Sequence, residues 1–284
     1  SAVTIGQAGT EMFYALGLGD KLAGTSLWFN DVLAQYKVQN DKVERLADND
    51  PSFEAVIGKR PQLVAVQLEW MVGPQGVVGT REQFHELNIP TYLMPSDCEG
   101  KDNLVGADGT RLEPFRIDSI YNSISQLAEI FDVQARGERL NSELKARLAK
   151  AAATVKGKDL KDTSALFWFS SADLDIDPYV AGRKGIPDYM LQTLGVRNVV
   201  PASLGPFPRL NPEFVVRANP DIIMIGNRSM QAMVPYPGWA SMRAIRENRL
   251  CVFGPGDSDV VVRPGPRMAE AARIMARCLV DKSS

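Results

Sequence analysis

Three arginines, each with a glycine or a proline nearby in the sequence, are the side chains best suited to hold an anionic ligand. Arg183 follows Tyr-Val-Ala-Gly, Arg209 lies within Gly-Pro-Phe-Pro-Arg-Leu, and Arg228 follows Gly226-Asn227. A planar guanidinium donates paired hydrogen bonds to carboxylate, hydroxamate or catecholate oxygens better than an ammonium group does. A solvated surface arginine is the competing interpretation for each one alone. Three on loops of one half of the chain favour an anion site.

Large aromatic side chains are the second group with a chemical use, because rigid rings form the walls of sites for large, flat ligands at little entropic cost. The residues concerned follow predicted strands or lie beside them, and they are Trp28, Phe29, Trp70, Trp168, Tyr179 and Trp239. Packing at strand ends is the competing interpretation. We expect Trp28 and Trp70 to face a ligand, and Trp239 is evenly balanced between the two roles.

The sequence argues against several other kinds of chemistry. His85 is the only histidine, there is no Gly-x-Ser-x-Gly motif, and three cysteines are too few for a zinc site. We therefore expect no catalytic residues, no bound metal of the protein's own and no cofactor. A net charge of −2 is also unlike that of a protein that grips the nucleic-acid backbone.

The elements that would position these side chains alternate between short apolar strands and amphipathic helices, which is typical of doubly wound α/β sheets. The predicted strands are Ala2–Ile5, Leu22–Thr25, Leu63–Val66, Thr91–Met94, Ala165–Phe169, Ile222–Ile225 and Leu250–Phe253. Between the two groups of strands lies a stretch rich in helix formers. Its apolar residues recur every three or four positions, which predicts helices separated by a break at Asp132–Val133.

An internal repeat divides the chain into two similar halves. Ser52–Val66 and Asn211–Ile225 both read as a helix opened by a glutamate, then a proline seven residues later, then a buried strand. A second echo pairs Ala15–Gly24 with Thr193–Pro201, where a helix ends at Leu-Gly, as expected for a glycine C-cap. Two α/β lobes on either side of a long helix account for both repeats.

These segments together resemble class III periplasmic binding proteins, the group that includes siderophore, haem and cobalamin receptors. The resemblance begins with GTEMFYALGLGDKLAGTS and continues through SFEAVIGKRPQLVAV, where Gln62 replaces the usual aspartate, and FHELNIPTYLM, where Asn88 replaces a glycine. It extends in order through NPEFVVRANPDIIMI, PGWASMRAIRENRLCVF and RPGPRMAEAARIMARCL. It thus covers nearly the whole chain.

The resemblance implies two doubly wound α/β lobes joined by a single long helix, with the ligand in a cleft between the lobes. In this sequence the N-terminal lobe would be residues 1–133, the connecting helix residues 134–156 and the C-terminal lobe residues 157–284. The ligand would lie beyond the carboxyl ends of the strands, where open α/β sheets bind ligands.

The function that the resemblance implies is that of a non-enzymatic receptor that delivers a metal chelate to an ABC importer. The three arginines favour an iron–siderophore, that is, an anionic ferric chelate. A cobalamin (corrinoid) or haem receptor of the same family is the alternative. From another class, a doubly wound α/β enzyme without a histidine-based site is the main rival.

The same resemblance implies a partner and a location. A glutamate on each lobe, here Glu54 and Glu213, would dock on the two subunits of an inner-membrane permease. A carboxylate that stabilises the helix dipole is the competing role, with Ser52 and Asn211 as plausible N-caps. We expect a monomer in the periplasm with its signal peptide removed, or an extracytoplasmic, membrane-anchored form if a lipoprotein cysteine has been removed.

One pair of cysteines is placed to form a disulfide. Cys251 begins the last predicted strand and Cys278 lies in the last predicted helix, which should pack back across that sheet. In an oxidising compartment the two could be bridged if their Cα atoms come within about 7 Å. Two buried thiols are the alternative. In either case Cys98 is outside the pair.

Overall fold

The fold is that of two compact α/β units. The computed structural model describes residues 1–98, 101–102, 110–111, 115–170, 179–180, 185–200, 212–226, 230–231, 233–254, 257 and 264–283. Unit 1 consists of Ser1–Leu112, Arg116–Leu144 and Pro264–Arg267. Unit 2 consists of Glu113–Phe115, Lys145–Arg263 and Met268–Ser284. A short segment near the C-terminus thus returns to unit 1.

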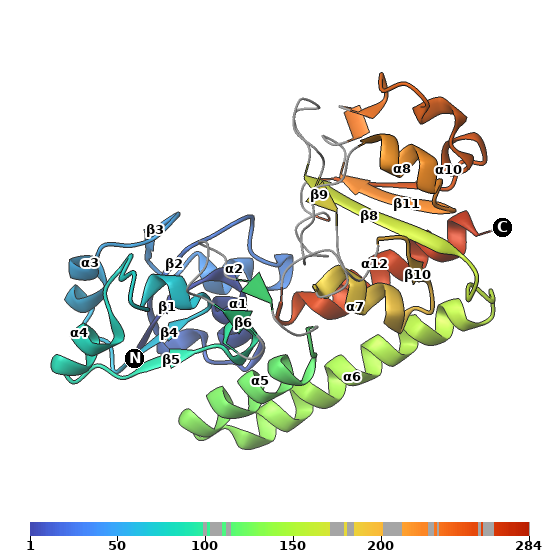
Figure 1. The fold of residues 1–284 in the computed structure, drawn as a ribbon. Helices are drawn as coiled ribbons and strands as arrows, with labels where there is room; N and C mark the ends of the chain where they lie inside the picture. The colour runs from blue at the N-terminus through green and yellow to red at the C-terminus, as the bar shows by residue number, and fades with distance from the viewer. Residues whose placement is uncertain are drawn as a thin grey trace. The chain divides into compact units, whose positions relative to one another are not determined.

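Unit 1 is built on a parallel sheet with the strand order β3-β2-β1-β4-β5 (Figure 1). The strands are β1 (Ala2–Ile5), β2 (Leu22–Ser26), β3 (Arg45–Ala47), β4 (Leu63–Val66) and β5 (Thr91–Leu93). Every residue of β1 and β4 is buried, so neither strand alternates between apolar and polar residues. Thr4 is the one polar residue of the two strands, and its hydroxyl is hydrogen-bonded to that of Thr10. β6 (Lys101–Asp102) and β7 (Thr110–Arg111) form a separate antiparallel pair.

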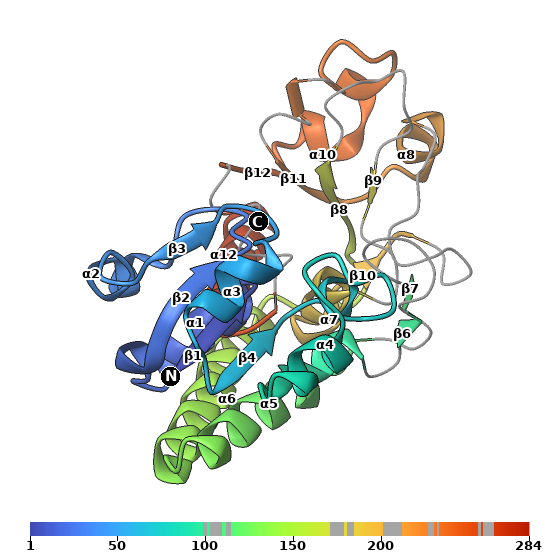
Figure 2. The ribbon, with the colours of Figure 1, turned by 90° about the vertical axis from the view of Figure 1, so that its left-hand side faces the viewer.

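The helices of unit 1 follow its strands. They are α1 (Gln7–Ala15), α2 (Lys37–Asn40), α3 (Phe53–Gly58), α4 (Arg81–Glu86) and α5 (Asp118–Ile130), with 3-10 turns η1 (Gly19–Lys21), η2 (Ala34–Tyr36), η3 (Glu69–Met71) and η4 (Pro95–Asp97). α1 lies beside β1 and β2 (Figure 2). In the hydrophobic core of unit 1, Val3, Val64 and Val66 of the sheet pack with Val56 of α3 and Phe84 of α4.

Unit 2 repeats this plan with the strand order β10-β8-β11-β12. Its strands are β8 (Ser164–Ser170), β10 (Arg197–Asn198), β11 (Ile222–Gly226) and β12 (Leu250–Phe253), all parallel, and β9 (Tyr179–Val180) pairs antiparallel with β8. Its helices are α7 (Ile186–Thr193), α8 (Pro212–Ala218), α10 (Arg243–Arg246) and α12 (Arg267–Lys282), with the turn η5 (Trp239–Ser241). α12 belongs to unit 2 from Met268 onward.

The long helix predicted over residues 134–156 is α6 (Gln134–Lys156). The break before it has a local cause: Asp132 adopts a left-handed conformation (φ 56°), and Val133 donates its N–H to the carbonyl of Ala128 at 2.7 Å, which closes the end of α5. The boundary between the units falls inside α6, between Leu144 and Lys145. This helix is therefore shared by both units.

The repeat seen in the sequence has a backbone counterpart. α3 leads into β4, which pairs with the first strand of unit 1, and α8 leads into β11, which pairs with the first strand of unit 2. Each helix ends at a left-handed residue followed by proline: Arg60 (φ 50°) before Pro61, and Asn219 (φ 47°) before Pro220. Proline cannot continue the helix, so both turns release the chain into the next strand.

α12 is linked to the sheet of unit 2 by a disulfide between Cys251 of β12 and Cys278, whose Cα atoms lie 6.0 Å apart. Cys98, the third cysteine, is exposed just after η4, with its sulfur 3.7 Å from the carbonyl oxygen of Met94. Within the described residues, no helix is long and apolar enough to cross a membrane.

Candidate functional site

The carboxyl ends of the parallel strands of unit 1 meet at one edge of its sheet, where a network of buried polar side chains is found. The turn after β1 requires Gly6, which has φ 126°, and a Cβ there would lie 2.3 Å from the Cβ of Gln67. The amide oxygen of Gln67 accepts a hydrogen bond from the N–H of Ala8 at 2.9 Å. A side chain thus occupies the amino end of α1, so the Gly6–Gly9 turn is explained as a strand-to-helix turn.

Gln7, the first residue of α1, holds the segment that follows β2. Its amide oxygen accepts hydrogen bonds from the N–H groups of Phe29 and Asn30 at 3.0 and 3.2 Å. Its amide nitrogen donates to the carbonyl of Asp31 at 3.0 Å. Three bonds from one buried side chain fix residues 29–31 at the carboxyl edge of the sheet.

Two neighbouring residues on this held segment have features of a binding surface. The Phe29 side chain is 38% exposed, which is unusual for a large aromatic residue. Both amide atoms of Asn30 are buried, and neither has a hydrogen-bond partner among the described residues. A buried amide without partners costs about 1–3 kcal/mol, so it suggests a ligand group as the missing partner.

A buried ion pair stabilises the segment that follows β2 at this edge. Arg267 donates two hydrogen bonds to the carboxylate of Glu11, at 2.6 and 3.0 Å, and a third to the carbonyl of Asp31. The second oxygen of Glu11 also accepts from the N–H of Leu33 at 2.8 Å. Burial raises the pKa of Glu11, and the hydrogen bond from Arg267 opposes that rise. The pair satisfies both charges, so Arg267 has a structural role here.

The aromatic residues predicted to face a ligand in unit 1 differ in their surroundings. Trp70 lies in η3 and is half-buried against the core. Its neighbour Glu69 is anchored by a hydrogen bond from its N–H to the carboxylate of Asp97 at 2.7 Å. Trp28 is only 8% exposed, and Arg45 covers its ring at 4.6 Å from the centroid. Trp70 and Phe29 are thus the more accessible rings.

Trp168 and Trp239 lie in the hydrophobic core of unit 2, together with Leu166, Ile223 and Ile225. Both rings are buried, and packing accounts for them. The Nε1–H of Trp168 has no hydrogen-bond partner among the residues that the structure describes. The structure thus favours the packing interpretation for these two residues over the role of ligand wall.

The remaining residues predicted to contact the ligand belong to unit 2. Tyr179 is in the short strand β9, next to the end of β8. Arg183, Arg209 and Arg228 lie outside the described residues. Among the described residues, no group of three or more histidine, cysteine, aspartate or glutamate side chains is arranged to hold a metal ion.

The two glutamates predicted to dock on a permease occupy matching positions. Glu54 is the second residue of α3 and Glu213 the second of α8, and both are exposed. Ser52 caps α3 by accepting a hydrogen bond from Ala55 at 3.1 Å. Glu213 forms an ion pair with Arg217 at 3.1 Å. Both carboxylates are thus accessible, and both lie where a helix dipole would favour them. Asn211 lies outside the described residues.

No site role was predicted from the sequence for Gln7, Gln67, Asn30 or the Glu11–Arg267 pair. One signal was available for the glutamines: each follows a buried strand almost directly, where a polar side chain must lie at the sheet edge. The ion pair left no such signal, because its members are 256 residues apart. This edge of the sheet therefore carries the exposed ring of Phe29 and the neutral amide of Asn30. Its buried cation, Arg267, is paired with Glu11.

Comparisons with known proteins agree with this architecture. The sequence profile of a family described as periplasmic binding protein matches residues 3–255. The uncharacterized ABC transporter substrate-binding lipoprotein YvrC of Bacillus subtilis is 25% identical over 278 residues, which is 98% of this chain and 79% of that protein. The vitamin B12-binding protein of Vibrio parahaemolyticus is 22% identical over 271 residues, covering 95% of this chain and 85% of that protein.

Solved structures show the same fold. A periplasmic binding protein from Veillonella parvula superimposes with a TM-score of 0.80 at 21% identity, covering 98% of this chain and 90% of that one. A protein of an ABC-type Fe3+-hydroxamate transport system from Saccharomonospora viridis superimposes with a TM-score of 0.73 at 19% identity, covering 98% and 92%. At such identities the likeness concerns the fold alone.

Proposed function

Because this chain belongs to the periplasmic binding protein family and is a substrate-binding protein of an ABC importer, we propose that its ligand is a large metal chelate, in the first place an iron–siderophore. The carboxyl edge of the unit 1 sheet is the part of the site that we assign from described residues. A rigid chelate presents both apolar surface and hydrogen-bonding groups, which are the two features that this edge can match.

The observation that carries the proposal is the pairing of Phe29 with Asn30 on one segment fixed by Gln7. An exposed ring offers contact area at low entropic cost, and an unpartnered amide offers an NH2 group as donor and a carbonyl oxygen as acceptor for the ligand. Trp70 adds a second ring on the same edge, after β4. A preorganised edge of this kind reduces the ordering that a ligand would have to impose.

The choice of a ferric siderophore rests on Arg183, Arg209 and Arg228. Their guanidinium groups would pair with the carboxylate, hydroxamate or catecholate oxygens of an anionic chelate. One structural neighbour belongs to an ABC-type Fe3+-hydroxamate transport system, and this agrees with the choice.

A corrinoid is the second candidate, and a specific observation favours it. The described edge of unit 1 combines rings with neutral amides, and its one buried cation, Arg267, is neutralised by Glu11. A ligand with little net charge suits such a surface. The vitamin B12-binding relative from Vibrio parahaemolyticus points to the same ligand class.

We further propose that Glu54 and Glu213 engage a permease dimer, and that the protein acts as a monomer outside the cytoplasm. The matching positions of the two glutamates on α3 and α8 support the docking role. The lipoprotein relative from Bacillus subtilis supports the location.

One titration separates the two ligands. Quenching of tryptophan fluorescence by a ferric hydroxamate and by cyanocobalamin gives the affinities for the two ligands. The Trp70→Phe variant identifies the contribution of the Trp70 ring to this quenching. For an anionic ferric chelate, Arg183→Ala, Arg209→Ala and Arg228→Ala should each cost about 2–5 kcal/mol. The matched control is Arg139→Ala, on an exposed arginine of α6. If cyanocobalamin binds tightly to the parent and to all three variants, the ligand is a corrinoid and not a siderophore.

A further inference from the structure

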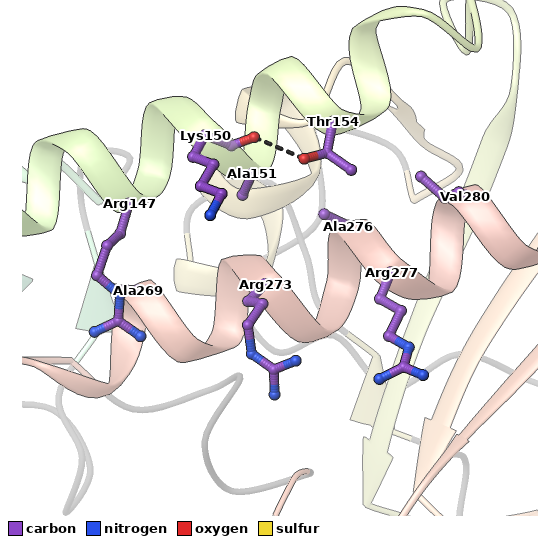
Figure 3. Close-up of a pocket in the computed structure, with 9 residues that line it drawn as sticks. All are labelled: Arg147, Lys150, Ala151, Thr154, Ala269, Arg273, Ala276, Arg277 and Val280. Atoms are coloured by element: carbon purple, nitrogen blue, oxygen red, sulfur yellow. Dashed lines mark hydrogen bonds between the residues drawn. The ribbon is translucent and has the colours of Figure 1, made fainter.

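A groove in unit 2 lies between the second half of α6 and the face of α12 opposite it (Figure 3). We call it the α6–α12 groove, and its volume is about 340 Å³. Its lining residues are Arg147, Lys150, Ala151, Thr154, Ala269, Arg273, Ala276, Arg277 and Val280. Those on α6 are spaced by three, one and three residues, which puts them on one face of the helix.

The groove has an apolar floor and a cationic rim. Ala151, Ala269 and Ala276 form the floor, and all three are buried, so the space between the helices exists because these side chains end at Cβ. Figure 3 shows the side chains of Arg147 and Lys150 extending from α6 toward α12, while those of Arg273 and Arg277 extend from α12 on the side away from α6.

The rim carries more positive than negative charge. Glu270 lies between two of its arginines, 2.5 Å from Arg273 and 3.5 Å from Arg147. Asp281 is 3.9 Å from Arg277. Lys150 forms no ion pair with a carboxylate in the part of the chain that the structure describes. The charge of Asp257 also acts on Arg273. Four cations thus face three carboxylates, whereas the whole chain has a net charge of −2.

We propose that the α6–α12 groove binds a small amphipathic organic anion, with one carboxylate or phosphate group joined to a slim apolar body. The anionic group pairs with Lys150 and the neighbouring arginines, and the apolar body lies on the alanine floor. Pockets for small organic ligands begin at about 300 Å³, so the groove is large enough for such a molecule and too small for a bulky chelate. This site is independent of the chelate site proposed above.

The test uses octanoate as the probe and the alanine methyl groups of the groove as reporters. In methyl NMR spectra of the full chain with 13C-labelled alanine, octanoate should shift the signals of Ala151, Ala269 and Ala276. Acetate has the charge without the apolar body, and 1-octanol has the apolar body without the charge. Both should bind at least about fivefold more weakly than octanoate, because each lacks one of the two contributions.

Two lysine variants on the same helix make the test specific. Lys150→Gln should weaken octanoate binding on the order of fivefold to tenfold, the usual effect of losing a charge-assisted contact. The matched control, Lys145→Gln, removes an exposed lysine that points about 200° away from Arg147 around α6 and does not line the groove. Its affinity should stay within about twofold of the parent's, as for a distant surface charge.

Three results would overturn the proposal. The first is that octanoate shifts only alanine signals outside the groove, such as that of Ala8. The second is that the two lysine variants bind octanoate equally well. The third is that octanoate does not bind at all while phosphatidylglycerol vesicles bind in a Lys150-dependent way. The last result would assign this face to a membrane surface.

Discussion

Glu11 and Arg267 lie 256 residues apart in the sequence, yet they form a buried ion pair with two hydrogen bonds inside unit 1. Arg267→Ala should destabilise the protein by about 3–5 kcal/mol in urea denaturation, because it leaves a buried carboxylate without its partner. Arg277→Ala, on the exposed face of the same helix, should cost less than about 1 kcal/mol.

The pH dependence of the Arg267→Ala variant gives a sharper check. Without Arg267, the pKa of Glu11 rises further, so the folded state prefers the protonated carboxyl. A carboxyl whose pKa is higher in the folded than in the unfolded state stabilises the folded state at low pH, and this contribution is lost as the pH rises. The deficit of the variant should therefore be smaller at about pH 4 than at neutral pH. A deficit that is equal at both pH values would show that Glu11 is not left charged and buried.

Asn30→Ala should separate stability from binding. The substitution removes a buried amide that has no described partner, so thermal stability should stay the same or increase. Ligand affinity should fall if the amide contacts the chelate. The control is Gln7→Ala, which deletes three hydrogen bonds and should lower the melting temperature. Unchanged affinity in Asn30→Ala would remove this residue from the site.

The Cys251–Cys278 disulfide predicts the thiol content of the protein. Titration of unfolded, unreduced protein should find one reactive thiol per chain, and three after reduction. Replacing both cysteines by serine should cost about 2–4 kcal/mol, because the bridge closes a segment with a sequence separation of 27 residues. Three thiols without reduction would mean that the two cysteines remain separate.

Tyr14 should titrate later than an ordinary tyrosine. Burial raises the pKa of Tyr14 to about 12, and its hydroxyl donates to the amide oxygen of Asn40 at 2.7 Å. Because the folded-state pKa is the higher one, its contribution to stability is complete below about pH 10 and is lost between about pH 10 and 12. Ultraviolet difference titration of the parent and of Tyr14→Phe should differ only in the component near pH 12.

Docking through Glu54 and Glu213 can be separated from a purely local role. Glu54→Ala and Glu213→Ala should leave ligand affinity unchanged and abolish stimulation of the transporter's ATPase in proteoliposomes. Glu82→Ala is the matched control, because Glu82 is an exposed carboxylate in the first turn of α4. All three variants should lose about 0.3–1 kcal/mol from the helix dipole. Normal stimulation by both docking variants would leave only the local role.

Much of the fold was predictable because buried parallel strands and helix ends leave local signals. The strands predicted at Ala2–Ile5 and Leu63–Val66 match β1 and β4 residue for residue. Asn88 lies where glycine is usual in the family, and it adopts a left-handed conformation, with φ 58°. β3, by contrast, was missed, because three residues at a sheet edge carry no apolar run of their own.

The candidate site was less predictable, since its residues act through partners that are distant in the sequence. Trp28 was expected to face a ligand, but its burial depends on Arg45 covering the ring, which spacing alone does not reveal. Phe29 and Trp70 were selected by their place after strands, and the structure leaves both accessible. The orphaned amide of Asn30 became visible only once Gln7 was seen to hold its segment.

The return of Pro264–Arg267 to unit 1 has a consequence for how the chain is made and divided. A ribosome must synthesise the larger part of unit 2 before the guanidinium that neutralises Glu11 emerges. Until then, the first unit carries an uncompensated charge in its interior and should remain open to proteases. For the same reason, no single cut in the chain yields both units whole, so a fragment ending before Arg267 should be less stable than the same unit in the intact protein.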